Sequence, residues 1–477
     1  MKCESLTQSI RDPRESCNAI NQKLADNGLF GDAKREIYSE QNSTWRISPE
    51  PFYLDPNIVA SLTNLGEQIN TFYHGVQRLY DLSCREKQPT WIREYLEAGK
   101  SEQVVAYGRM RRFKQDYPLI IRPDILLTND GFVASELDSV PGGFGLLAAL
   151  SQYYGELGFE LIGGNSGILD SFVSAIRSQV SVPDPNLAII VSKESQDYLK
   201  EMQWLSQALS KIGLQSFTLA PEDIIFQEDG LYVQEKTGAK KIHAIYRFFE
   251  LFDLKNIPKM DLILYAVRKQ LVTITPPLKS YLEEKMLFGL LHHPTLCSFW
   301  QSELGANTYT NLKQVFPKTW IVDPNPLPPH AVIPELQVGD RPVTDWQQLK
   351  GASKKERQFV LKVSGFSEQA WGSKGVTIGH DMAATEWGKS MDTALRSFPK
   401  NPYVLQQFHK STQVHALYYD FESTQIKEMQ GRVRLCPYYF RTNDKVELAG
   451  ILATICPLDK KLIHGMVDAI MVPTALR

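Results

Sequence analysis

The feature that most constrains this chain is a predicted β-hairpin that carries three carboxylates. Two apolar runs, 119–128 and 132–137, flank an Asn-Asp-Gly turn at 129–131, a pattern typical of two antiparallel strands joined by a tight turn. Because side chains alternate along a strand, Arg122 and Asp124 share one face of the first strand. The sequence therefore predicts a short ribbon with a charged end.

The second strand brings two further acids to this ribbon. Glu136 and Asp138 share one face near its end, so they and Asp124 are expected to meet at one end of the hairpin beside Arg122. Oxygen-only ligand sets suit Mg²⁺, which in proteins commonly works on phosphates. The pattern predicts a magnesium site, with ordinary solvated carboxylates as the alternative.

Composition excludes several classes of partner. The chain has 477 residues, with 52 Lys+Arg against 54 Asp+Glu and a net charge of −2, so no overall field recruits nucleic acid or an anionic membrane. No run approaches the roughly 18 apolar residues of a membrane span. We expect neither nucleic acid nor membrane as a partner.

Cysteine usage points to a reducing compartment. The six cysteines are scattered without Cys-x-x-Cys spacing, and the polar amino terminus has no apolar signal-peptide core. We therefore expect a cytoplasmic protein with reduced thiols.

Four segments are expected along the chain. They are a loosely held helical leader at 1–44, a helical segment plus the acidic hairpin at 45–185, a Rossmann-like α/β unit at 186–275, and two lobes with a glycine-rich flap at 364–379 within 276–477.

Apolar spacings of three and four predict a core helix over 57–82. The loop Gly142-Gly143-Phe144-Gly145 precedes a helical stretch at 146–156, so its N–H groups would lie at a helix amino terminus, where they can hold an anion.

The alternation of an apolar strand at 186–192, a helix at 194–212 and a strand at 215–219 predicts a parallel layer. No Gly-x-Gly-x-x-Gly follows the first strand, which argues against a dinucleotide.

A phosphate-covering flap is predicted in the last third of the chain. Lys362 lies on an apolar strand at 358–363, and Gly372 and Gly375 punctuate the loop that follows. Glycine lets backbone amides approach anionic oxygens, and a mobile loop admits nucleotide. A further strand is expected at 403–408.

The segment from Arg122 to Asp124, followed by Glu136-Leu-Asp138-Ser139-Val-Pro141, resembles the Arg-x-Asp … Glu-x-Asn-x-Asp-Thr-Pro segment of glutathionylspermidine synthase and its relatives. These are circularly permuted ATP-grasp ligases, similar in layout to eukaryotic glutathione synthetase. The resemblance implies that Asp124, Glu136 and Asp138 hold Mg²⁺ on ATP, and that Arg122, helped by Ser139, holds an acyl phosphate. Asp138 replaces the usual Asn.

The resemblance implies an α/β (α+β) ATP-grasp fold, circularly permuted, with an inserted Rossmann-like pre-ATP-grasp layer. The acidic hairpin near residue 136 precedes the flap, an order typical of the permuted group. The implied ATP-binding residues are Lys285, Lys362, Gly372, Gly375, Gln406, Gln407 and Phe408, and Glu368 is an additional metal ligand.

Lys285 lies beside a predicted helical face made by Leu282, Met286 and Leu290. By itself it reads as a surface lysine, whereas relatives carry a lysine here that reaches the ATP phosphates.

Arg247 and Glu250, at the end of a strand from 242, either hold an amine or carboxylate substrate or form a structural salt bridge.

The function implied by the resemblance is an ATP- and Mg²⁺-dependent ligase that joins a small carboxylate to an amine through an acyl phosphate, with release of ADP. Two alternatives stay open. The same residues could serve a kinase with a small-molecule acceptor, or a nucleotide-binding protein without activity, which Asp138 in place of Asn favours.

Overall fold

The computed structural model describes residues 12–29, 45–370, 375–443, 445–460, 463, 465 and 468–477. Residues 1–11 and 30–44 of the leader, and the flap residue Gly372, lie outside these ranges. The α-helices of the described chain are α1 (Pro13–Asp26), α2 (Pro56–Cys84), α3 (Trp91–Glu97), α4 (Glu102–Arg109), α5 (Phe144–Glu156), α6 (Gly167–Ser178), α7 (Leu199–Lys211), α8 (Met260–Arg268), α9 (Met286–His292), α10 (Cys297–Leu304), α11 (Ala306–Val315) and α12 (Ala384–Ser397).

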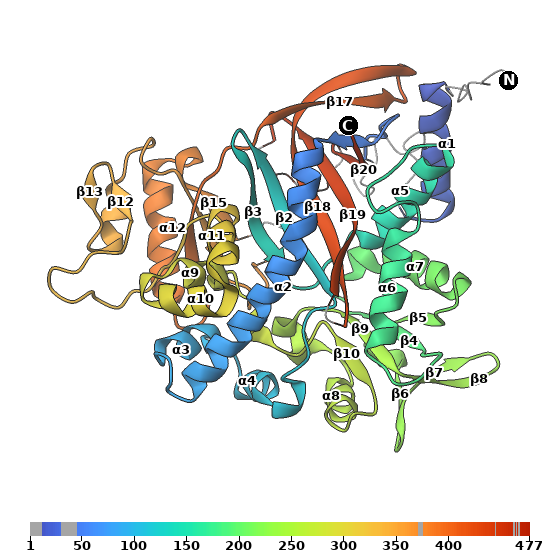
Figure 1. The fold of residues 1–477 in the computed structure, drawn as a ribbon, viewed down its shortest axis with the longest axis horizontal. Helices are drawn as coiled ribbons and strands as arrows, with labels where there is room; N and C mark the ends of the chain where they lie inside the picture. The colour runs from blue at the N-terminus through green and yellow to red at the C-terminus, as the bar shows by residue number, and fades with distance from the viewer. Residues whose placement is uncertain are drawn as a thin grey trace.

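A mainly antiparallel sheet lies at the centre of the molecule (Figure 1). Among the described residues its order is β1-β20-β19-β18-β2-β3, with β17 also paired to β18. The strands are β1 (Phe52–Leu54), β2 (Ile120–Thr128), β3 (Gly131–Asp138), β17 (Gln413–Asp420), β18 (Gln425–Thr442), β19 (Lys445–Pro457) and β20 (Ile470–Leu476). The hairpin predicted from the Asn-Asp-Gly turn is confirmed as β2 and β3.

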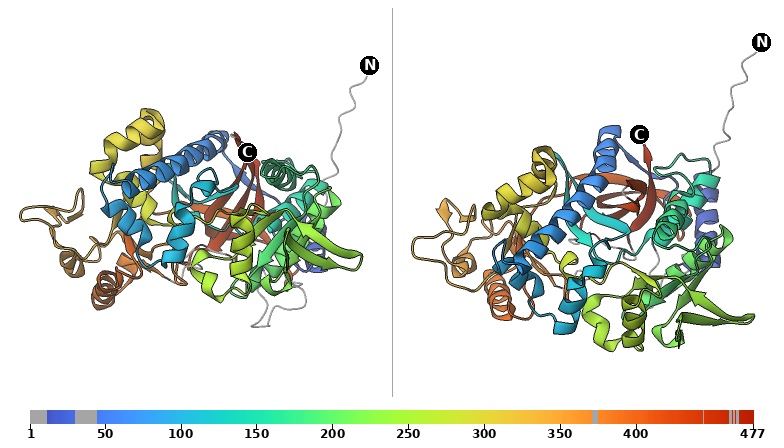
Figure 2. Two further views of the ribbon diagram at one scale, coloured as in Figure 1. Left: turned by 90° about the horizontal axis from the view of Figure 1, so that it is seen from below. Right: turned by 60° about the horizontal axis from the view of Figure 1, so that its bottom comes forward.

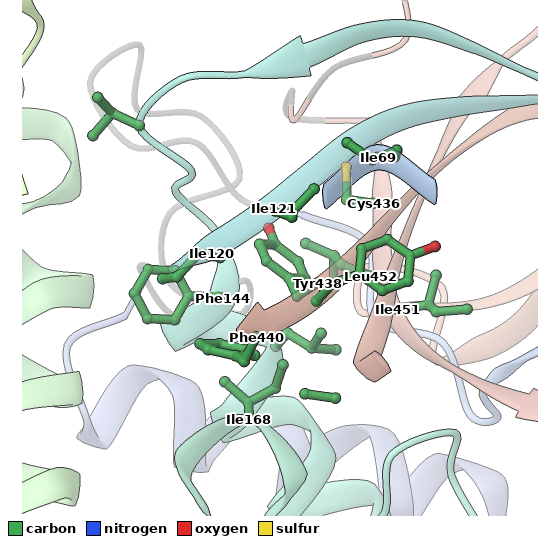
Figure 3. Close-up of a cluster of buried hydrophobic side chains, with 14 of the residues drawn as sticks. Ile69, Ile120, Ile121, Phe144, Ile168, Cys436, Tyr438, Phe440, Ile451 and Leu452 are labelled. Carbon is green, nitrogen blue, oxygen red and sulfur yellow. The ribbon is translucent and has the colours of Figure 1, made fainter. Parts of the chain in front are cut away.

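Helices cover both faces of this sheet. Successive residues of β18 point to opposite faces, so side chains of this strand contact helices on both sides. Tyr439 faces α2, where its hydroxyl donates to the carbonyl of Leu62 at 2.6 Å. Phe440 faces the other side, where its ring lies 6.4 Å from that of Phe144 in α5. Figure 3 shows Phe144, Phe440 and Ile168 gathered beside this strand. The core helix predicted over 57–82 is confirmed as α2.

The predicted parallel layer is also confirmed. Strands β4 (Leu187–Val191), β5 (Ser216–Leu219), β9 (Ala244–Phe248) and β10 (Thr273–Thr275) are parallel in the order β10-β9-β4-β5. Figure 2 shows this unit, in green, on one side of the central sheet. Its identity as an inserted layer stays a prediction, as do the segment boundaries.

A third sheet carries the flap. Strands β11 (Thr319–Ile321), β14 (Phe359–Val363), β15 (Val376–Ile378) and β16 (Tyr403–Gln407) are antiparallel in the order β11-β16-β14-β15. The loop between β14 and β15 is the predicted flap. Two small ribbons complete the strands: β6 (Ile225–Gln227), β7 (Gly230–Glu235) and β8 (Gly238–Ile242), and β12 (Gln337–Val338) with β13 (Arg341–Pro342).

Two local predictions were wrong. The helix expected around Leu282, Met286 and Leu290 begins only at Met286, so Lys285 immediately precedes α9. Residues 274–282 are all buried, so apolar spacing in them marks no helical face. The leader is not loosely held over residues 13–26, because α1 is packed against the core.

No helix among the described residues combines the length and the apolar character that crossing a bilayer would demand.

The packing of α1 against the core predicts a measurable contribution of this helix to the free energy of unfolding. Leu24 is fully buried, so Leu24→Ala should lower the free energy of unfolding by about 2–5 kcal/mol, measured by urea denaturation. Glu15→Gln, on the exposed side of the same helix, should change it by less than about 0.5 kcal/mol. Equal effects of the two substitutions would show that α1 is not docked.

Candidate active site

The hairpin brings together the four charged residues expected at its end. In the register of β2 and β3, Asp124 lies opposite Glu136 and Arg122 lies opposite Asp138. The two pairs are two residues apart along each strand, so all four side chains project from one face of the ribbon. This confirms the predicted grouping.

Two cavities meet at this face. The hinge cavity, about 790 Å³, lies between the hairpin and the third sheet, and its lining includes Lys362 and Phe408. The loop cavity, about 560 Å³, lies between the hairpin and the parallel layer, and its lining includes Ser139 and Glu250. Three residues line both cavities: Asp124, Glu136 and Arg434. The acidic ribbon therefore forms a wall that two adjoining cavities share.

Both predicted lysines reach this wall. Lys285 Nζ lies 3.6 Å from Glu136 Oε2 and donates to the flap carbonyl of Ala370 at 2.7 Å. Lys362 Nζ donates to the carbonyl of Ser135 at 2.9 Å. Two ammonium groups from distant segments thus lie near Glu136. An anionic phosphate group at this wall would need the same two groups as partners.

Burial makes Lys362 unusual among lysines. It is only 6% exposed, and burial lowers its pKa to about 8, with Lys285 acting in the same direction and Glu136 opposing. A second anion beside this ammonium would restore its charge.

Arginines already pair with two of the predicted metal ligands. Asp124 lies 3.1 Å from Arg122 Nη2 and 3.0 Å from Arg434 Nη1. Burial raises the pKa of Asp124, but the two arginines outweigh it and hold that pKa below the usual value. Asp138 forms an ion pair with Arg122 and accepts from the backbone N–H of Val140 at 3.1 Å.

The three carboxylates predicted as metal ligands lie on one face of the hairpin, but they do not form one ligand cluster in this structure, and their metal role stays a prediction. In the part of the chain that the structure describes, no three His, Cys, Asp or Glu side chains lie close enough to share a metal. One nitrogen of Arg122, Nη2, pairs with both Asp124 and Asp138, so a guanidinium group takes the place between these two carboxylates. A two-carboxylate site still fits, because Mg²⁺ is commonly held by one or two carboxylates plus phosphate oxygens. The facing pair Asp124 and Glu136 has that composition.

The two predicted substrate residues, Arg247 and Glu250, have different surroundings in the structure. Ser139 Oγ donates to Glu250 Oε2 at 3.2 Å, and both residues line the loop cavity. Burial, together with Glu283 and Asp138, raises the pKa of Glu250 to about 8. A half-buried carboxyl group with a raised pKa is stabilised in its charged form by a cationic partner.

Arg247 does not line the loop cavity. It is 0% exposed, and it donates to the carbonyls of Pro276 and Phe249 at 2.8 and 2.7 Å and pairs with Glu283. Its guanidinium is used in holding the backbone together. Of the two interpretations open from the sequence, the structure supports the salt bridge, although with Glu283 rather than with Glu250.

The flap residues differ in their placement. Gly375 begins the return toward β15, where a Cβ atom would lie 2.6 Å from the carbonyl of Gln369, so glycine is needed there. Gly372 lies outside the described residues. Glu368 is exposed and is not among the residues that line either cavity, so the structure does not support it as a metal ligand.

The hinge residues Gln406, Gln407 and Phe408 all line the hinge cavity. The main-chain N–H of Gln407 donates to the backbone carbonyl of Lys318 at 2.8 Å, and that of Phe408 donates to the backbone carbonyl of Gln358 at 3.0 Å. These two donors are therefore engaged within the protein, and adenine contacts at this strand would come from carbonyl groups or from the residues that follow it.

Three residues of the site had no assigned role in the sequence prediction. Arg434 and Cys436, on β18, line the loop cavity, and Cys436 Sγ donates to Asp124 Oδ1 at 3.5 Å. The alternating pattern of β18 was the only signal for Arg434. Glu201, on α7, reaches the same cavity, and burial raises its pKa to about 7 against the lowering effect of backbone hydrogen bonds. Its sequence context is an ordinary amphipathic helix.

Comparisons with known proteins support the fold. A glutathione synthetase-like effector from Globodera pallida, solved in its apo form, matches with a TM-score of 0.56 and 10% sequence identity, over 98% of this chain and 98% of that chain. This chain shares the fold of that effector. The expected mixed α/β architecture is confirmed at this level, while the ATP-grasp assignment and the circular permutation stay predictions.

A protein from Methylobacillus flagellatus named as a gamma-glutamylcysteine synthetase matches with a TM-score of 0.40 and 12% identity, over 82% of this chain and 84% of that chain. This second likeness is too weak to support a fold assignment. No model of a known protein family matches the chain, and no curated protein matches it in sequence.

The structural role of Arg247 is testable. Arg247→Met should lower the free energy of unfolding by about 3–5 kcal/mol, since it leaves Glu283 buried without its partner. Urea denaturation measures this, with Arg268→Met on the exposed side of α8 as the control. Unchanged stability with weakened substrate binding would instead make Arg247 a substrate residue.

Proposed function

We propose that this chain is an ATP- and Mg²⁺-dependent ligase that joins a carboxylate to an amine through an acyl phosphate and releases ADP. The observation that carries this proposal is the wall of Asp124, Glu136 and Arg434 between two cavities. A nucleotide bound in one cavity can place its terminal phosphate at this shared wall, next to the carboxylate of a substrate bound in the other cavity. Permuted ATP-grasp ligases, and the glutathione synthetase-like fold match, supply the precedent.

The hinge cavity is the proposed nucleotide site. Val360 and Ile378 give it apolar walls next to the hinge strand, where a flat base would pack. Lys362 lies toward the acidic hairpin, where phosphates would lie. Asp124 and Glu136 would hold Mg²⁺, which would neutralise phosphate charge there.

The loop cavity is the proposed site of the acid and the amine. Arg122 lines it, and its Nε–H is buried without a partner, so one donor remains for a phosphate or carboxylate oxygen. Glu250 is placed to accept a proton from, or pair with, the amine, and Ser139 orients Glu250. Lys285 links the wall to the flap, which would exclude water from the reactive acyl phosphate.

A second candidate function is nucleotide binding without turnover. The ion pairs of Asp124 and Asp138 with arginines favour it, because they lower the net negative charge available to Mg²⁺. A kinase is the third candidate. Parallel assays of ADP and phosphate release separate all three: a ligase releases both ADP and phosphate only when acid and amine are both present, a kinase releases ADP without free phosphate when a single acceptor is present, and a binding protein releases neither.

Glu136 should be essential for turnover. Glu136→Gln removes the charge that faces Asp124 while keeping its shape, so the rate of phosphate release should fall at least about 100-fold. Asp130→Asn, in the exposed turn of the same hairpin, should leave the rate within about twofold. Comparable losses in both variants would mean that the hairpin acts only through stability.

Nucleotide affinity should depend on pH through Lys362. Below about pH 7 its ammonium is charged in the free protein, so affinity is flat. Above its pKa of about 8, binding must recharge the amine, so affinity should fall by up to about tenfold per pH unit.

Calorimetric titration with an ATP analogue that cannot be hydrolysed measures this pH dependence. Lys362→Arg, which stays charged, should abolish it. An identical pH profile in Lys362→Arg would remove Lys362 from the nucleotide site.

A further inference from the structure

A third cavity, which we call the edge cavity, lies beside strand β11. Its volume is about 150 Å³, and it shares no lining residue with the hinge cavity or the loop cavity. An apolar cavity of this volume can hold one aromatic ring. The apolar and aromatic side chains of its lining come from α3, β11 and residues 327–346: Tyr95, Trp320, Ile321, Leu327, Ile333, Pro334 and Trp346.

Strand β11 leaves one backbone donor and one backbone acceptor unused beside this cavity. Among the described strands, β11 pairs only with β16. The N–H of Gln407 donates to the carbonyl of Lys318 at 2.8 Å, and the N–H of Val322 donates to β16 at the carbonyl of Tyr403 at 3.0 Å. Backbone groups of alternate residues face the partner strand in an antiparallel pair, so those of Ile321 face the free edge. Within the described residues, no hydrogen bond engages the N–H or the carbonyl of Ile321.

His292, at the end of α9, adds a second acceptor to the lining. Its Nε2 lies 2.9 Å from the carbonyl of Phe316, and because a carbonyl only accepts, this nitrogen carries the proton. Burial, together with Lys313 and Lys318, lowers the pKa of His292 to about 4 against the opposing effect of this hydrogen bond, so the ring is neutral near pH 7. Its Nδ1 is therefore an acceptor, and no partner for it lies in the part of the chain that the structure describes.

The charged groups of the edge cavity are already paired with one another. Lys318 forms an ion pair with Glu335, and Asp323 accepts from the hydroxyl of Tyr95. Burial lowers the pKa of His293, so this ring adds no charge near pH 7. None of the described lining residues therefore offers a free cation to an anionic ligand, and the cavity favours a neutral one.

We propose that the edge cavity binds a neutral aromatic ring that carries a primary carboxamide. The ring packs against Trp320 and Trp346, which line the cavity. The amide oxygen accepts from the N–H of Ile321, and the NH₂ group donates to the carbonyl of the same residue. The other amide hydrogen remains for Nδ1 of His292. This site is separate from the proposed ligase chemistry and does not depend on it.

Benzamide and benzoate test this assignment, because they share a ring and a size but differ in charge and in N–H donors. In isothermal titration calorimetry, benzamide should bind the full-length protein with a Kd of about 1 mM or tighter. Benzoate should bind at least about tenfold more weakly, since it donates neither to Ile321 nor to His292 and finds no free cation.

A backbone variant locates the ligand. Ile321→Pro removes the N–H that faces the free edge and leaves the ladder to β16 intact, so the affinity for benzamide should fall at least about tenfold. Val332→Ala, at an exposed position outside the lining, should keep this affinity within about twofold. Circular dichroism shows whether each variant is folded.

Where Ile321→Pro does not fold, a crystal of the wild type soaked in benzamide replaces it, and the amide should lie within hydrogen-bond distance of the Ile321 backbone. The proposal would be overturned if benzamide does not bind, if benzoate binds equally well, or if a folded Ile321→Pro protein keeps the wild-type affinity. Benzamide bound only elsewhere in the crystal would overturn it as well. The ligase assay could fail without affecting any of these results.

Discussion

A carboxylate buried between two arginines fixes the geometry on which both cavities depend. Asp124 is only 3% exposed, and it is paired with Arg122 on its own strand and with Arg434 on the neighbouring β18. A buried ion pair of this kind contributes less through net stability than through the large cost, roughly 3–5 kcal/mol, of losing one partner. The hairpin is therefore fixed against the central sheet at the point where its acids emerge.

The position of this ribbon explains how three separate layers contribute to one site. The flap sheet supplies Lys362 and the segment before α9 supplies Lys285, whereas the parallel layer supplies Glu250. These segments meet at the charged face of the hairpin. Charge alternates across that face: acids of the ribbon lie beside ammonium and guanidinium groups from other segments. This arrangement suits a ligand that carries both phosphate and metal.

The parts of the site predicted from sequence are those fixed by local geometry. The Asn-Asp-Gly turn sets the pairing from Thr128 to Ile125, and a β-bulge between Ile125 and Asp124 then shifts the register so that Asp124 lies opposite Glu136. Strand alternation and glycine spacing likewise located Lys362 and the flap. Which charged side chains form ion pairs with one another was not predictable in the same way. Periodicity placed Arg122 near two acids, but only the folded structure shows that it pairs with both Asp124 and Asp138.

The roles of residues whose partners lie far away in sequence were left open or missed for the same reason. Arg247 lies on a strand whose residues are all buried, and the carbonyls that surround it come from residues 249, 276 and 277, which no spacing rule connects. Glu201 is one of several charged residues on a helix, and only the approach of α7 to the glycine loop distinguishes it.

The most direct test of the shared wall is a crystal structure with an ATP analogue that cannot be hydrolysed and with Mn²⁺, whose anomalous signal locates the metal. The account predicts a single strong anomalous peak bound to Glu136, between the terminal phosphate and the hairpin, with the base against the hinge strand. Phosphates bound elsewhere, with no metal near Glu136, would contradict it.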